Sequence, residues 1–196
     1  GVEALVDGLL PILTRPASTG DYQGLAEADL VVVFRADPSR THPLVKTEIV
    51  QGVQQRGQHL VLAHALSGGL ERHADESLQL EPGSEADLLS GLAKSLLDER
   101  PVLEHRVDDV PGAQDWIGSL AGYDEETVCR LTGAPASTFR RIVRLLMQSR
   151  RPQLVVVTGQ GIPGDEAAAA RAAVQLSALL PGNGGVLVLG EKANLQ

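Results

Sequence analysis

The stretch Leu30-Val31-Val32-Val33-Phe34 holds five consecutive apolar residues, three of which are β-branched valines. Apolar and polar positions do not alternate in it, which is typical of a strand that helices cover on both faces of a parallel sheet. Three more short apolar runs, residues 60–63, 154–157 and 186–189, share this pattern. The four runs therefore predict the central strands of a parallel sheet.

Helical patterns separate these runs and settle the fold class. Residues 41–56, 84–99 and 165–180 are long enough for crossover helices, and the last of them is rich in alanine, the best helix former. Strands that alternate with such helices predict right-handed βαβ units. We expect an α/β fold with a doubly wound, Rossmann-like parallel sheet of about five strands in the order 3-2-1-4-5. Its weaker edge strand is expected at residues 77–80.

The middle of the chain, residues 101–151, has no strand pattern and is interpreted as a helical insertion within a single α/β domain spanning residues 1–196. Helices are expected at 113–120, 124–131 and 137–149, with Asp124 and Ser137 as N-caps and Gly122 and Gly133 as stops. A short apolar helix is expected at residues 2–10. The chain does not begin with Met, and we interpret it as a fragment of a larger subunit.

Composition excludes several classes of function. The chain has 196 residues with 17 Lys and Arg against 25 Asp and Glu, a net charge of −8, which argues against a nucleic-acid partner. No signal peptide and no unbroken membrane-spanning run is visible, so no direct membrane insertion is expected. The single cysteine, Cys129, excludes an internal disulfide or a cysteine-cluster metal site within these residues. The spacing of the five histidines is not typical of a metal site either.

The loop Gly159-Gln160-Gly161-Ile162-Pro163-Gly164 is the most conspicuous motif. It follows a predicted strand and opens a predicted helix, which is the context of a dinucleotide-binding fingerprint. The acidic residue expected to bind the ribose would be Glu191, which lies further along the chain than that fingerprint requires. Asp165 also places a negative charge where a phosphate would sit. An independent NAD-binding module is therefore a minor alternative, since a plain strand-to-helix turn also needs glycine.

Two other loops can be interpreted either as ligand sites or as ordinary turns. Residues 35–43 follow the first strand, where open α/β sheets bind ligands, but Asp37 and Pro38 also suit a turn, with Thr41 or His42 capping the next helix. Residues 81–87 begin another helix, where Ser84 and Asp87 form a pair resembling a capping box. In both loops we favour the structural role.

Taken in order, these segments resemble one family. ADLVVVF at 28–34 and ADPSRTHP at 36–43 resemble the "ADLILVxGxNPxxxHP" stretch of the molybdopterin oxidoreductases. No single motif is specific, but the ordered set is. Five further segments are similar to the family's later motifs: GQHLVLA at 57–63, LQLEPGSEADLL at 78–89, GYDEET at 122–127, GQG at 159–161 and GNGG at 182–185.

The resemblance implies a set of cofactor-binding positions. In the family's enzymes these loops grip a molybdopterin guanine dinucleotide. By resemblance, Asp37, His64, Ser84 and Glu85 would line one nucleotide half, and the later glycine motif corresponds to Gly159 and Gly161. The segments that hold the metal ligand and the iron–sulfur cluster normally precede this region. Cys129 lies outside the ligand motif and is expected to be a small buried residue in a helix.

The departures from the family pattern predict that the cofactor is lost. Arg35 replaces a family glycine, and its bulk should fill space that the glycine leaves free. Asp37 replaces an asparagine, and His64 begins a His-Ala-Leu segment where the family has Asp-Pro-Arg. Glu81 replaces a basic residue, so we expect it to repel the phosphates. These changes, all at one ligand site, indicate a structural domain that no longer binds the cofactor.

Large iron–sulfur subunits of respiratory complex I commonly keep this fold without the cofactor. The resemblance therefore favours a cofactor-free structural domain of the iron–sulfur subunit of NADH-quinone oxidoreductase, in the cytoplasmic peripheral arm of a membrane-associated complex. Its expected partners are the rest of the parent subunit and the other subunits of a respiratory complex. No catalytic residue, metal or cofactor is expected in this fragment, although the parent could hold molybdopterin guanine dinucleotide. The alternative is the guanine-dinucleotide half-site of a formate-dehydrogenase-like catalytic subunit.

Overall fold

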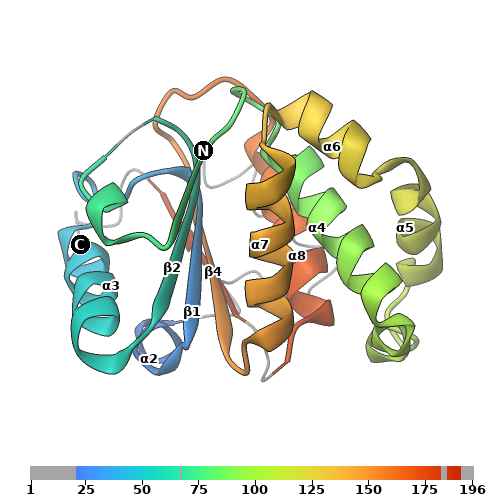
Figure 1. The fold of residues 1–196 in the computed structure, drawn as a ribbon, viewed down its shortest axis with the longest axis horizontal. Coiled ribbons are helices and arrows are strands. Elements are labelled where there is room, and N and C mark those ends of the chain that lie inside the picture. The colour runs from blue at the N-terminus through green and yellow to red at the C-terminus, as the bar shows by residue number, and fades with distance from the viewer. Residues whose placement is uncertain (1–20, 67, 182–184, 191–196) are drawn as a thin grey trace.

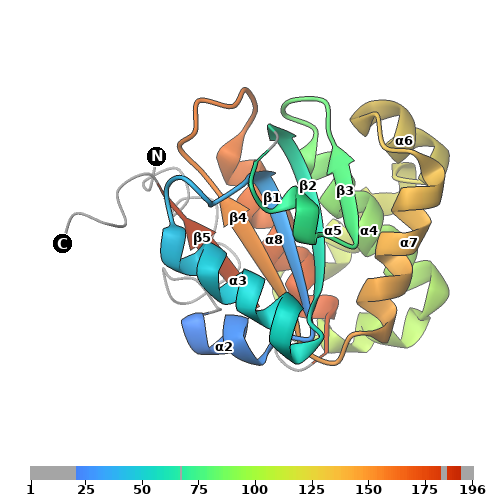
Figure 2. The ribbon, with the colours of Figure 1, turned by 60° about the vertical axis from the view of Figure 1, so that its left-hand side comes forward.

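The fold is built on a parallel sheet of five strands. The structure, a computed structural model, describes residues 21–66, 68–181 and 185–190. The expected order 3-2-1-4-5 is confirmed, as Figure 2 shows from β5 across to the short edge strand β3. The expected helix at residues 2–10 lies outside the described residues. The strands are β1 (Leu30–Ala36), β2 (His59–Leu66), β3 (Glu76–Gln79), β4 (Pro152–Val157) and β5 (Gly185–Leu189).

Helices cover both faces of the sheet, which confirms the doubly wound α/β fold (Figure 1). On one face lie α2 (Tyr22–Glu27) and α3 (Pro43–Arg56), and on the other lie α4 (Glu85–Glu99) and α8 (Glu166–Leu179). Side chains of β1 alternate between two cores, so that Val32 and Phe34 face α4 and α8 whereas Val33 packs on the α3 side. α2, whose six residues bury only Leu25, was not predicted from its sequence.

Between α4 and β4 the chain is helical, as expected. It forms η2 (Pro101–Arg106), α5 (Ala113–Ser119), η3 (Leu120–Gly122), α6 (Glu125–Thr132) and α7 (Ala136–Gln148). Asp124 caps α6 by accepting a hydrogen bond from the Thr127 amide, and Gly133 ends α6 in a left-handed conformation. The predicted cap at Ser137 is wrong, because α7 already begins at Ala136 and Pro135 occupies the N-cap position.

The amino end of β1 is tied to the end of α7 by one carboxylate. Asp29 accepts hydrogen bonds from the backbone amides of Arg150 at 2.8 Å and Arg151 at 3.1 Å, and from the Ser149 hydroxyl. Burial opposes the charge, but these hydrogen bonds outweigh it and lower the pKa of Asp29. These hydrogen bonds hold the carboxyl end of α7 against the start of β1. In the described part of the chain, no helix is long and apolar enough to cross a membrane.

The packing of α4 against α6 depends on a residue without a side chain. A Cβ atom on Gly91 would lie 2.3 Å from Cγ2 of the buried Val128, whereas a Cβ on Gly118 in α5 would meet no heavy atom within 4 Å. Gly91→Val should therefore lower the free energy of unfolding by about 2 kcal/mol through overpacking. The matched Gly118→Val should change it by less than about 0.5 kcal/mol. Urea denaturation measures both, and equal effects of the two substitutions would contradict this account of the interface.

Candidate functional site

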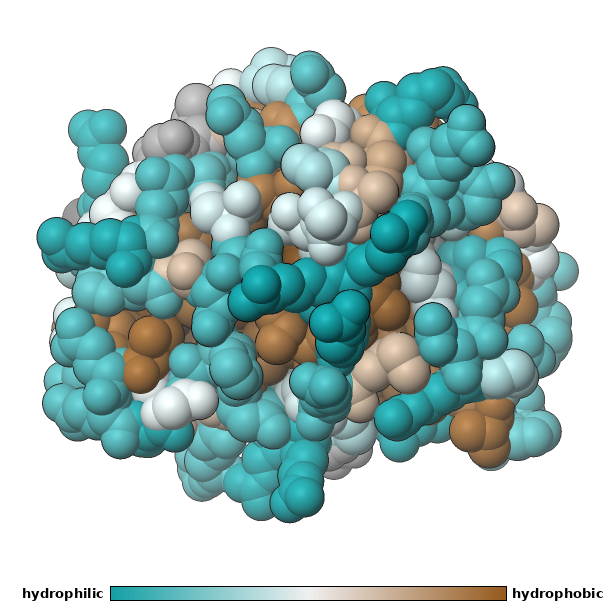
Figure 3. All heavy atoms as spheres, viewed as in Figure 1, coloured by the Kyte–Doolittle hydropathy of each residue, from teal (hydrophilic) through white to brown (hydrophobic). Residues whose placement is uncertain are grey.

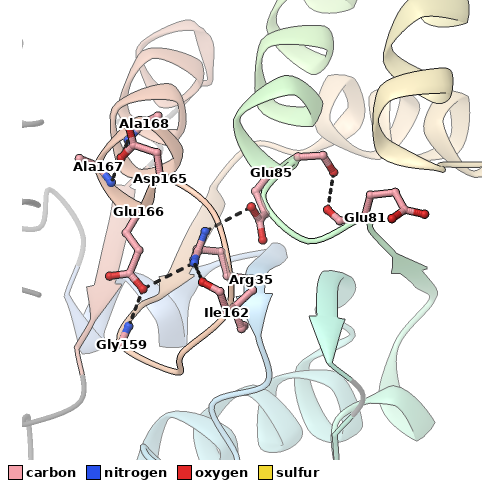
Figure 4. A network of polar contacts seen from close by, with 10 residues as sticks. Arg35, Glu81, Glu85, Gly159, Ile162, Asp165, Glu166, Ala167 and Ala168 are labelled. Carbon is pink, nitrogen blue, oxygen red and sulfur yellow. Dashed lines mark hydrogen bonds and ion pairs between the residues drawn. The ribbon is translucent and has the colours of Figure 1, made fainter.

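The candidate site lies at the carboxyl ends of β1 and β4. The chain leaves β1 toward α3 on one face and leaves β4 toward α8 on the other. This reversal is the topological switch point, and open α/β sheets bind their ligands in the crevice that it creates. The loops after β1, β3 and β4 meet here (Figure 4).

A guanidinium group fills this crevice. Arg35 Nη1 donates a hydrogen bond to Glu85 Oε2 at 3.2 Å, and Nη2 donates to the Ile162 carbonyl at 3.1 Å. Nη2 also lies 3.5 Å from Glu166 Oε1, so the cation sits between two carboxylates (Figure 4). The side chains of Arg35 and Glu85 are each 1% exposed. The Arg35 side chain is therefore buried between the loops at this edge of the sheet and does not point into solvent.

The two carboxylates stand at helix N-termini. Glu85 is the first residue of α4 and Glu166 is the first residue of α8. Backbone amides and the helix dipole make such ends favourable places for a negative charge. Glu166 Oε1 additionally accepts a hydrogen bond from the Gly159 amide at 2.8 Å. The chain therefore supplies from its own side chains the anions that a phosphate ligand would supply.

The backbone at Arg35 is strained. Its φ of 76° makes it the one non-glycine residue with positive φ in the described part of the chain. A left-handed conformation costs an L-residue with a Cβ about 1–2 kcal/mol. The register of β1 against β2 also shifts between Arg35 and Ala36. The polar contacts of the guanidinium hold the residue in a conformation that glycine would adopt without strain.

Glycines bring two loops into direct contact beside this cation. A Cβ on Gly164, after β4, would lie 2.4 Å from the Cα of Gly83, which follows β3. Gly159 and Gly161 have φ values of 77° and 65°, so the loop needs glycine for its own conformation. Asp165 caps α8 by accepting hydrogen bonds from the amides of Ala167 and Ala168. Two amides in the first turn of α8, where a dinucleotide fingerprint would bind phosphate, are therefore already bonded to Asp165.

Asp37 and His64 bond to other partners than Arg35 does, although His64 is opposite Arg35 in the register of β1 and β2. One carboxylate oxygen of Asp37 accepts a hydrogen bond from the Ser39 amide at 2.7 Å, and the other accepts from the Leu70 amide at 2.8 Å. His64 Nε2 lies 3.3 Å from Ser77 Oγ and 3.4 Å from Glu71 Oε1, at the 3₁₀ turn η1 (Glu71–His73). Both side chains organise the loops around β2 and β3.

Two expectations for the loop after β3 are wrong. Ser84 does not form a capping box, because it adopts a turn conformation and its hydroxyl donates to the Glu81 carbonyl at 2.7 Å. Glu81 does not add negative charge to the crevice. Its backbone amide bonds to the Thr132 carbonyl, and its side chain extends toward Gly133 and away from Arg35 (Figure 4).

Sequence reasoning missed Glu166, which completes the pair of carboxylates around Arg35. Its position directly after a strand and a glycine-rich loop is the signal that could have identified it. Cys129 is half-buried on α6, not fully buried as expected, and packs against the edge of the larger core. Burial raises the pKa of its thiol, which disfavours the reactive thiolate form. Among the described residues no group of three or more His, Cys, Asp or Glu side chains could hold a metal ion.

The chain resembles several curated oxidoreductases along most of its length. Formate dehydrogenase H of Escherichia coli is 24% identical over 161 residues, which cover 80% of this chain and 22% of that protein. The F420-dependent formate dehydrogenase 2 subunit alpha of Methanococcus maripaludis is 23% identical over 155 residues, 79% of this chain and 23% of that protein. The homologues of the present chain are members of the molybdopterin oxidoreductase family. No family model matches the chain.

Solved structures show the same fold. The acetylene hydratase from Pelobacter acetylenicus superposes with a TM-score of 0.70 at 15% identity, over 90% of this chain and 24% of that one.

A further sequence relative is the probable oxidoreductase YjgC of Bacillus subtilis. It is 26% identical over 143 residues, which cover 72% of this chain and 14% of YjgC. This chain thus spans from about one seventh to one quarter of the length of these homologues.

Replacing Arg35 separates the ion pair from the backbone strain. Arg35→Ala should lower the free energy of unfolding by about 3–5 kcal/mol, because it leaves Glu85 buried without its cation. Arg35→Gly should be about 1 kcal/mol more stable than Arg35→Ala, since glycine accepts the positive φ. Urea denaturation measures both values. Arg144→Ala, at an exposed position, is the control and should change stability by less than about 0.5 kcal/mol.

Equal stabilities of Arg35→Gly and Arg35→Ala would contradict the strained backbone. A loss below about 1 kcal/mol for both would contradict a structural role of the buried ion pair.

Proposed function

We propose that this chain is a structural domain of a formate-dehydrogenase-like oxidoreductase subunit, in which an arginine of the chain fills the crevice that would hold a nucleotide. The observation that carries the proposal is the buried contact of Arg35 with Glu85 and Glu166 at the switch point. The domain would fold and pack as its homologues do. The reaction itself would take place elsewhere in the parent protein.

The fold family implies a molybdopterin guanine dinucleotide, and the residues at this crevice do not fit one. A diphosphate needs free helix N-termini and cations, but Glu85 and Glu166 already stand at both helix ends. One arginine and two glutamates carry a net charge of +1 − 2 = −1. Two like unit charges 4 Å apart repel by about 4 kcal/mol at an effective dielectric constant of 20. Both oxygens of Asp37 are likewise bonded to backbone amides.

Formate dehydrogenases among the homologues support a formate-dehydrogenase-like parent more than NADH-quinone oxidoreductase. The second candidate remains the iron–sulfur subunit of the latter complex, and the filled crevice favours it because a cofactor-free domain is what that assignment requires. Both assignments leave this domain the same structural role. Placement in the peripheral arm of a respiratory complex stays a prediction of the resemblance.

The contacts around the glycine-rich loop argue against an independent NAD-binding module. The Gly159 amide is bonded to Glu166, and Asp165 holds two amides of the first turn of α8. A pyrophosphate would have to displace both carboxylates, each of which would repel it. We therefore favour the structural role for this loop as well.

Calorimetric titration of the chain with GDP tests the proposal. GDP carries the guanine, ribose and diphosphate of the implied nucleotide half. We expect no binding with a dissociation constant at or below about 10 μM, which corresponds to about −7 kcal/mol. The same result is expected for NAD and NADH. Binding of any of them at or below this value would contradict a domain whose crevice is closed by its own side chains.

The triple variant Arg35→Gly, Glu85→Gln, Glu166→Gln is the matched control. It removes the cation that fills the crevice together with the two carboxylates that would otherwise be left unpaired and would repel a diphosphate. If the crevice is closed only by these side chains, the variant should bind GDP at least tenfold more tightly than the unaltered chain does. Circular dichroism of the variant establishes that it folds. Equal, measurable GDP affinity in both proteins would show that the nucleotide binds elsewhere.

A further inference from the structure

A second concave surface lies on the helical layer, away from the crevice. α4, α6 and α7 enclose a pocket of about 460 Å³, a size typical of ligand and side-chain binding sites. Its apolar floor is formed by Phe139 and Val143 of α7, which are 1% and 7% exposed, and by the half-buried Met147. Figure 3 views the molecule from the side of α7, where hydrophobic surface shows between the hydrophilic side chains that surround it.

Cations surround this apolar floor. Three guanidinium groups line the pocket, from Arg100 at the end of α4 and from Arg140 and Arg144 on α7. Glu99 and Glu125 are its carboxylates, so the lining carries a net charge of +3 − 2 = +1 on a chain whose net charge is −8. α7 contributes arginines and no acidic residue. The pocket is therefore a local exception to the acidic character of the chain.

The three arginines differ in how they are bound. Arg140 makes two parallel hydrogen bonds to Glu125, at 2.7 Å from Nε and 2.6 Å from Nη2. Within the described ranges, the side chains of Arg100 and Arg144 have no ion pair or hydrogen bond. Both residues of the bonded pair, Arg140 and Glu125, belong to the pocket lining. The two unpaired guanidiniums leave planar donors for carboxylates at its rim.

We propose that this pocket docks an acidic amphipathic helix of a partner subunit. One apolar side chain of that helix would contact the half-buried Met147, above the buried Phe139 and Val143. Its flanking carboxylates would bind Arg144 and Arg100. A groove between two helices that receives the apolar face of a third is a recurring mode of recognition. The unpaired cations select an acidic helix over a basic one.

A partner subunit is the source favoured by the comparisons. Relatives of this chain are named as alpha subunits. One is the NADPH-Fe(3+) oxidoreductase subunit alpha of Geobacter sulfurreducens, which is 23% identical over the whole of this chain. The match covers 24% of that subunit. The pocket shares no residue with the Arg35 contacts at the carboxyl ends of the strands. The inference thus goes beyond the proposed function, and each can fail without the other.

An array of overlapping 15-residue peptides tests the proposal. The peptides tile the remaining sequence of the parent protein and the subunits that copurify with it, and the labelled 196-residue chain is the probe. We expect the strongest binding from a segment of a copurifying subunit that carries at least two carboxylates around Leu, Met, Phe or Tyr. In fluorescence polarisation, Arg144→Glu should weaken that peptide at least tenfold. Arg150→Glu, a charge reversal outside the pocket, should weaken it less than twofold.

Four results would overturn the proposal: a strongest peptide from the parent's own remaining sequence, a strongest peptide without acidic residues, equal effects of the two charge reversals, or no peptide that binds better than its scrambled version. Displacement of the bound peptide by millimolar succinate alone would assign the pocket to a small dicarboxylate and also overturn it. Thermal unfolding of both variants controls for loss of structure.

Discussion

The structure depends on one buried cation at the switch point of the sheet. A guanidinium removed from water is unfavourable unless carboxylates and carbonyls surround it, and Arg35 finds two carboxylates and the Ile162 carbonyl. Those partners come from α4, from α8 and from the loop after β4. A single side chain therefore joins the end of β1 to two segments that are distant from it in sequence, the start of α4 and the loop that leads from β4 into α8.

The glycine contact beside this cation follows from the same requirement. Gly83 lies in the loop that leads to Glu85, and Gly164 lies in the loop that leads to Glu166. The backbones of these two loops are in direct contact at the two glycines. Side chains at these positions would hold the loops apart and would separate Glu85 from the guanidinium. Close approach of the loops and neutralisation of the cation are therefore two parts of one arrangement, in which the space expected for a ligand is used by the chain itself.

The order of the sheet was predictable because it depends on local patterns. Each apolar run, such as the one around Val32, marks a strand that must be covered on both faces, and right-handed crossovers then leave few topologies. Helix caps were predictable where one residue decides them, as at Asp124 and Gly133. Ser84 and Ser137 have the right residue type but the wrong backbone conformation, which depends on how the preceding loop packs. That packing is tertiary information that a local pattern does not contain.

The candidate site also has features that could be predicted from the sequence and features that could not. Comparison with a family glycine singled out Arg35 as bulky, but not the partners it would find. Glu166 was overlooked, since an acidic residue in the first turn of a helix is explained by the helix dipole alone. Glu81 has the charge that was expected to matter, yet its direction is set by the Thr132 carbonyl and by the neighbouring Gly133, both more than fifty residues away. Which way a charged side chain points is decided by contacts between distant segments.

The left-handed backbone of Arg35 also bears on the history of the chain. An arginine introduced before its two glutamates would have combined a strained φ with an unpaired buried charge. Glutamates introduced first would have stood in the crevice without a counterion. Replacement of Arg35 or Glu85 alone meets the same penalty, because each leaves the other as an unpaired buried charge. Selection for stability alone therefore preserves the pair, and drift does not readily reopen the crevice.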